Sequence, residues 1–173
     1  MKDLFARYRV PLLACGLALG IQLYAMFSLK WMLMPLAFLV SGMQGTALHD
    51  AGQAGYSDAT GHLFISSDCA GINYLLLLFL LPVFYFLPGM TLRKQFRYMF
   101  LFLALSWIGT LGVNAARISV SISLLNYTRT WSGLMGSWAH EATGIVYFLL
   151  FLLLYFRFLR FYFTSTPTHE NIQ

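Results

Sequence analysis

Four long apolar runs, nearly free of charge, constrain this chain more than any other feature. They cover residues 10–29, 70–88, 98–116 and 138–158. Each is close to the roughly 20 residues that a helix needs to cross a bilayer. Only 10% of the 173 residues are charged, whereas about 25% are charged in an average soluble domain. The sequence therefore predicts an all-α integral membrane protein, built as a single domain over residues 1–173 with about four transmembrane helices.

The first run follows a basic start formed by Lys2, Arg7 and Arg9. A basic end before an apolar stretch also suits a secretory signal peptide. However, the run is longer than a typical signal core, and no clear small-x-small cleavage site follows it. We therefore expect it to remain as the first membrane span.

Between the first two runs lies a short apolar segment and then the most polar part of the chain. Residues 31–41 contain Pro35 and are too short to cross a membrane, which favours an interfacial or re-entrant helix. Residues 42–68 are rich in glycine and predict a loop with one short strand at residues 62–65. A second loop is expected at residues 126–137.

Basic residues divide into two groups along the chain. Eight of the eleven fall at the N-terminus, between the second and third runs, and at the end of the fourth, at positions 2, 7, 9, 93, 94, 97, 157 and 160. The other three are Lys30, Arg117 and Arg129. With four spans these groups lie on opposite faces, and the positive-inside rule places both termini in the cytoplasm. Because the basic residues flank apolar runs, we expect no nucleic-acid partner.

Cys69 stands at the start of the second run, where a thiol meets both water and the positive end of a helix dipole. Both conditions favour the nucleophilic thiolate. The neighbouring Asp68 would oppose thiolate formation, and a packing cysteine is the plain alternative. Cys15 lies inside the first span, so no disulfide is predicted. No spacing of His and Cys residues suggests a metal site or a cofactor.

The four-span topology brings Cys69, Arg117 and His140 to the same outer face. A cysteine thiolate attacks a peptide carbonyl and forms a thioester, while a histidine takes and returns the proton. An arginine stays charged and offers a rigid fork of donors to a developing oxyanion. This combination predicts a catalytic site for acyl transfer.

Neighbouring residues suggest support for this site. Asn114 and Ser121 lie at i−3 and i+4 from Arg117 on one helix face and are expected to orient it. Gly144 is one turn from His140 and would let another helix approach closely.

Other interpretations stay open. Arg117 would serve equally as an anchor that reaches the membrane surface, and His140 as a boundary histidine bonded to a carbonyl. Glu141 is a rival acid or base, and His49 or His62 would replace His140 as the partner of Cys69.

Three motifs on these segments resemble the exosortase/archaeosortase family. They are Cys69-Ala70-Gly71-Ile72, Asn114-Ala115-Ala116-Arg117 and His140-Glu141-Ala142-Thr143-Gly144. Residues 31–42 with the polar loop resemble the short subtype called exosortase K. The resemblance covers most of residues 30–160, although many members have Ser where this chain has Ala70 and contain more spans.

The resemblance implies a membrane cysteine transpeptidase or protease of a prokaryotic cell (inner) membrane, with its active site at the outer face. Its substrates would be exported proteins with a C-terminal sorting signal, as in PEP-CTERM proteins. A membrane lipid or glycolipid is a candidate acceptor for the acyl group, and water would make the same enzyme a protease. The alternative outside enzymes is a non-catalytic membrane assembly or transport subunit.

Overall fold

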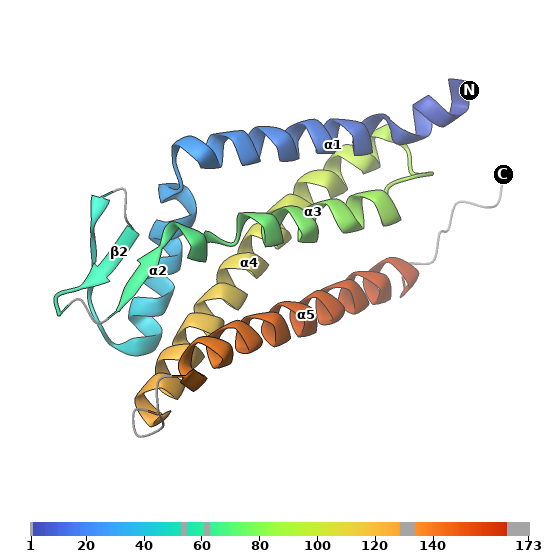
Figure 1. The fold of residues 1–173 in the computed structure, drawn as a ribbon. Coiled ribbons are helices and arrows are strands. Elements are labelled where there is room, and N and C mark those ends of the chain that lie inside the picture. Colours follow the sequence, from blue (N-terminus) through green and yellow to red (C-terminus); the bar gives the residue numbers. More distant parts are fainter. Residues whose placement is uncertain (1, 53–54, 61–62, 129–133, 166–173) are drawn as a thin grey trace.

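The computed structural model describes residues 2–52, 55–60, 63–128 and 134–165. Its elements in chain order are α1 (Lys2–Phe27), α2 (Lys30–Gln44), β1 (Leu48–Asp50), β2 (Gly55–Asp58), β3 (Phe64–Ser66), the 3-10 helix η2 (Ser67–Ala70), α3 (Ile72–Phe86), α4 (Leu92–Thr128) and α5 (Leu134–Ser165). Helices dominate, as the sequence predicts, and a small sheet is added at one end (Figure 1).

Four segments are long and apolar enough to cross a membrane, which confirms the predicted multi-pass architecture. They are Tyr8–Phe27, Ser67–Phe86, Leu92–Ser123 and Ala142–Phe163. The third belongs to α4, which is one continuous helix of 37 residues. At 1.5 Å per residue α4 is about 55 Å long, well beyond the thickness of the hydrocarbon core. Its second half therefore carries Arg117 past the span predicted at residues 98–116.

The spans are arranged with two distinct ends (Figure 1). The start of α1, the α3–α4 connection and the end of α5 lie at one end, which holds the basic residues Arg93, Lys94 and Arg97. The sheet, α2, the end of α4 and the start of α5 lie at the other end. This arrangement agrees with the two groups of basic residues in the sequence.

The expected short helix is present as α2 and runs across the direction of α1 (Figure 1). Its buried side chains include Met32, Leu36 and Val40, spaced four residues apart on one face, as a helix with a single packed face requires. At its C-terminal end, Nε2 of Gln44 donates to the carbonyl of Ser119 in α4 at 3.2 Å. The helix is thus fixed to α4 close to Arg117.

The polar segment at residues 42–68 is not the loop with one strand that the sequence predicts. It forms a three-stranded antiparallel sheet in the order β1-β2-β3. Its strands have only three or four residues each, which is too short for a clear alternating pattern. Nζ of Lys30 and Oδ2 of Asp50, 2.9 Å apart, connect α2 to β1. The hydrogen bond from Lys30 lowers the pKa of Asp50 below its ordinary value.

The predicted loop at residues 126–137 is shorter than expected. Helix α4 continues to Thr128 and α5 begins at Leu134, while residues 129–133 lie outside the described part. Helical backbone therefore extends into the segment where polar and glycine residues indicated a loop.

Candidate active site

Cys69 lies on a separate turn before the second membrane helix. It belongs to η2, and Gly71 follows with φ 69°, a left-handed conformation that glycine adopts easily. Helix α3 then begins at Ile72. The break at Gly71 thus separates the Cys69 turn from α3 within the span Ser67–Phe86, at whose start the sequence places Cys69. The thiol is half-buried, with Sγ 3.8 Å from Oγ of Ser66.

Gly71 connects this turn to α4. A Cβ at Gly71 would overlap Nδ2 of Asn114 and lie 3.2 Å from Cγ2 of Thr110. Only a residue without a side chain permits such an approach. The Cys69 turn is thereby placed directly over the Thr110–Asn114 segment of α4, three residues before Arg117.

Arg117 lies between α4 and α5. Its Cζ is 5.4 Å from the ring centroid of Phe148, within the range of a cation–π interaction. A Cβ at Gly144 would be 3.3 Å from both Cδ and Nη1 of Arg117. The sequence predicts that Gly144 lets another helix approach closely, and the atoms next to Gly144 belong to the Arg117 side chain of α4.

Asn114 does not hydrogen-bond to Arg117, contrary to the prediction that it orients the guanidinium. Asn114 is 1% exposed, and neither Oδ1 nor Nδ2 has a hydrogen-bond partner. Nε of Arg117 is likewise buried and unpaired. The reason is geometric: Asn114 faces Gly71, whereas Arg117 extends toward Gly144 and Phe148 on α5. Among the residues whose side chains the structure describes, which do not include Glu141, no carboxylate forms an ion pair with Arg117.

His140 and Glu141 lie on the backbone of α5, but their side chains are outside the described part of the structure. Position 140 is one helical turn before Gly144 and two turns before Phe148. Residues four apart share one face of a helix. The row of α5 that contacts Arg117 is therefore the row that contains position 140.

A row of polar residues runs along α4 at spacings of three or four. Ser106, Thr110 and Asn114 are almost fully buried, and Arg117 and Ser121 continue the row. Oγ1 of Thr110 has no hydrogen-bond partner, whereas Oγ of Ser106 is 3.4 Å from the Tyr155 hydroxyl. The sequence analysis missed Ser106 and Thr110. Their spacing of four residues within an apolar span was the signal that would have identified them.

Tyr74 is a second residue that the sequence analysis missed. Its hydroxyl donates to the carbonyl of Phe148 at 2.8 Å, and the two rings are 4.4 Å apart between centroids. One aromatic residue of α5 thus contacts both α3, through Tyr74, and Arg117. These contacts hold the three membrane helices together beside the Cys69 turn.

Among the rival bases, His49 is the one whose side chain the structure describes. His49 is exposed on β1, and β2 separates it from β3, the strand before the Cys69 turn. His62 lies outside the described residues. Asp68 is exposed, and solvent and salt screen the effect of its charge on the neighbouring thiol.

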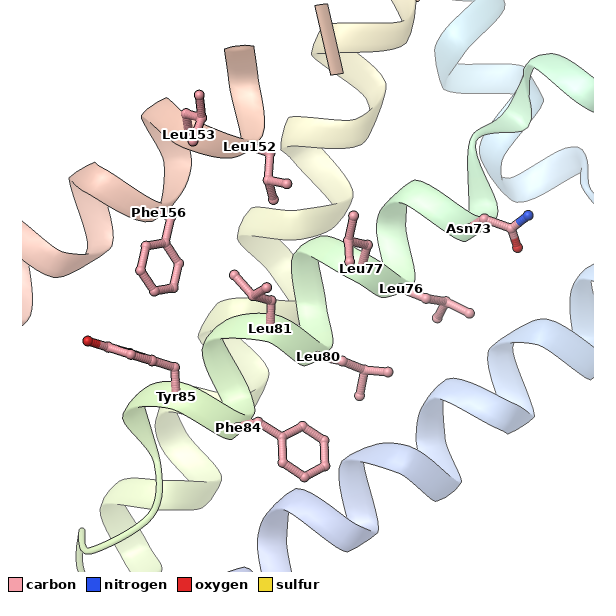
Figure 2. Close-up of a pocket in the computed structure, with 10 residues that line it drawn as sticks. All are labelled: Asn73, Leu76, Leu77, Leu80, Leu81, Phe84, Tyr85, Leu152, Leu153 and Phe156. Atoms are coloured by element: carbon pink, nitrogen blue, oxygen red, sulfur yellow. The ribbon is translucent and has the colours of Figure 1, made fainter. Parts of the chain in front are cut away.

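An apolar groove of about 850 Å³ runs between α3 and α5 (Figure 2). It extends from Asn73, four residues after Cys69, toward Tyr85 near the opposite end of α3. The side chains of Leu77 and Leu81 lie between α3 and the α5 residues Leu152 and Phe156 (Figure 2). This surface suits lipid or an apolar helix.

In the described part of the chain, no group of three or more His, Cys, Asp or Glu residues is arranged to hold a metal ion. Comparison with protein-family models, with curated proteins and with solved structures gives no match for this chain.

Proposed function

We propose that the protein is a membrane cysteine transpeptidase or protease that cleaves exported proteins at a C-terminal sorting signal. The observation that carries this proposal is a continuous series of contacts between the three predicted catalytic segments. The Cys69 turn meets α4 through Gly71 and Asn114, and Arg117 meets α5 at Gly144. These contacts support a site shared by three segments that lie far apart in the sequence.

In the proposed reaction, the Cys69 thiolate attacks the scissile carbonyl carbon, and the carbonyl oxygen takes the negative charge. Arg117 stabilises that oxyanion, and His140 accepts the thiol proton and delivers it to the leaving amine. The C–N bond breaks and a thioester remains on Cys69. A second nucleophile then attacks the thioester carbonyl, gives its proton to His140 and displaces Cys69, and His140 returns that proton to the Cys69 sulfur. That nucleophile is a membrane lipid or glycolipid in a transpeptidase, and water in a protease.

The site faces the outer side of a prokaryotic cell membrane in this proposal. The basic end of the bundle is cytoplasmic by the positive-inside rule. A sorting signal that includes its own membrane span would approach within the lipid, along the apolar surfaces of the helices. The half-buried thiol at the boundary suits a peptide bond just outside such a span.

The two cysteines give a matched test. Both are free thiols and half-buried, but Cys15 lies within α1 and Cys69 on η2. We expect Cys69→Ser to abolish cleavage of a co-expressed protein that carries a C-terminal motif, membrane span and basic tail. The Cys15→Ser variant should cleave this substrate normally when it is present in the membrane at the same amount. Equal activity of both variants would exclude Cys69 as the nucleophile and favour a non-catalytic membrane subunit.

A further inference from the structure

We propose that the free edge of β3 binds the substrate as an added β-strand and thereby aligns its scissile bond with Cys69. This inference rests on the proposed function and names how that site holds its substrate. β3 is an edge strand, because the sheet order is β1-β2-β3. Its three residues lead directly into the turn that carries Cys69.

The register shows which backbone groups of β3 point away from the sheet. The amide of Asp58 donates to the carbonyl of Leu63 at 3.0 Å, so these residues form a hydrogen-bonded pair. Such pairs alternate with non-bonded pairs along an antiparallel ladder. The next pair, Ser57 with Phe64, is therefore non-bonded. The pair Tyr56 with Ile65 is hydrogen-bonded, and the pair Gly55 with Ser66 is again non-bonded.

Phe64 and Ser66 consequently direct their amide and carbonyl groups toward the open edge. The Ser66 carbonyl lies at the N-cap of η2 and starts that helix. Three groups remain for a partner: the Phe64 amide, the Phe64 carbonyl and the Ser66 amide. None of them hydrogen-bonds to another described residue. An extended peptide satisfies such groups, as in the recognition mode in which a ligand strand extends a sheet.

The position of this edge fits the chemistry at Cys69. Ser66 is three residues before Cys69, and its Oγ is 3.8 Å from the thiol sulfur. A peptide paired with Phe64 and Ser66 would therefore be extended as it reaches the nucleophile. Ile65 is fully buried and fixes the strand to the core, so the edge is a rigid template.

Side chains also distinguish β3 from the opposite edge. Edge strands are commonly protected by charged residues, and β1 carries Asp50, which pairs with Lys30. β3 consists of Phe64, Ile65 and Ser66 and has no charge. The side chain of Phe64 is 49% exposed and offers a surface for cross-strand packing. An uncharged edge strand with an exposed aromatic side chain therefore suits pairing with an extended peptide.

The test compares backbone and side-chain changes at one position. Phe64→Pro removes an outward amide, whereas Phe64→Ala keeps that amide and removes the ring. Asp50→Pro makes the same backbone change on an outward position of β1, and it is compared with Asp50→Ala, which keeps the amide and likewise lacks the ion pair to Lys30. We expect Phe64→Pro to raise the KM for the tailed substrate at least about tenfold, because a substrate carbonyl loses its donor. Asp50→Pro should have the same KM as Asp50→Ala, and the KM of Phe64→Ala should lie between those of the wild type and Phe64→Pro.

Labelling of Cys69 by a water-soluble thiol reagent reports whether the turn is intact in each variant. Normal cleavage by Phe64→Pro, with Cys69→Ser inactive, would overturn the edge proposal and leave the proposed function in place. Equal losses in Phe64→Ala and Phe64→Pro would also overturn it, since the ring alone would then matter. Cleavage that persists in Cys69→Ser would instead contradict the proposed function.

If Phe64→Pro does not fold, a proline scan of the substrate tests the strand pairing with the wild-type enzyme. Every second residue of a paired strand directs its backbone groups toward its neighbour. Proline should therefore block cleavage at alternate positions near the scissile bond. A scan without this alternation would overturn the proposal.

Discussion

Gly71 and Asn114 are in direct contact, and this contact places the Cys69 turn on the helix that carries Arg117. A side chain at position 71 would occupy the space of the Asn114 carboxamide. Gly71 also ends η2 and precedes α3 with a left-handed backbone. A single glycine therefore provides both the break before the membrane helix and the close approach between two segments of the site.

The first prediction tests this contact. Gly71→Ala should greatly reduce cleavage, because it adds backbone strain of about 1–2 kcal/mol and a steric overlap with Asn114. Gly45→Ala is a matched control, since Gly45 has nearly the same φ of 65° and nothing within 4 Å of an added Cβ. It should show only the loss from strain. Cleavage rates and thermal unfolding in detergent measure both effects.

A double variant refines that test. If the overlap with Asn114 is the main cause, Gly71→Ala combined with Asn114→Ala should recover stability relative to Gly71→Ala alone. An additive loss would show that the two residues are independent.

The second prediction concerns the chemistry of Arg117. Lysine would replace an arginine that merely anchors a helix, because both side chains extend to the membrane surface. A residue that holds an oxyanion through a planar fork would not tolerate lysine. We expect Arg117→Lys to lower the cleavage rate by about 10²–10³, as loss of an oxyanion donor does.

Arg129→Lys is the control for that change, because the sequence places Arg129 on the same side and outside every motif. It should cleave normally at a matched membrane level. Similar activity of the two lysine variants would reduce Arg117 to an anchor and leave Cys69 and His140 as the candidate site.

The third prediction tests the contact between α4 and α5. Gly144→Leu should displace the Arg117 side chain and lower cleavage, because Cδ and Nη1 already lie 3.3 Å from an added Cβ. Gly112→Leu places the same side chain on α4 where nothing lies within 4 Å. Cleavage by Gly112→Leu should be close to wild type, and equal losses in both variants would contradict a specific role for Gly144.

The fourth prediction concerns orientation in the membrane. Reporter fusions at Thr46 and at Gln173 should report opposite sides, with Gln173 cytoplasmic. The reason is the concentration of basic residues at the end of the bundle formed by the start of α1, the α3–α4 connection and the end of α5. Reporters on one and the same side would contradict the four-span topology and the shared site together.

The sequence by itself determined the membrane architecture and the number of spans. Long uncharged runs leave helices as the natural structure in lipid, because each backbone polar group must be paired within its own segment. The same reasoning identified α2, whose length and aromatic start separate it from the spans. These features depend on composition along a local stretch, which a sequence displays directly.

Only the tertiary structure decided how the site residues meet. The sequence placed Cys69 at the start of the second span and expected Asn114 to orient Arg117. The structure sets Cys69 on a separate turn that ends at Gly71, and it turns Asn114 and Arg117 to different neighbours. The structure also contains a sheet whose strands are too short to show an alternating pattern of apolar and polar residues in the sequence. Contacts of this kind depend on the packing of helices distant in the chain, and local periodicity does not specify which partner each side chain faces.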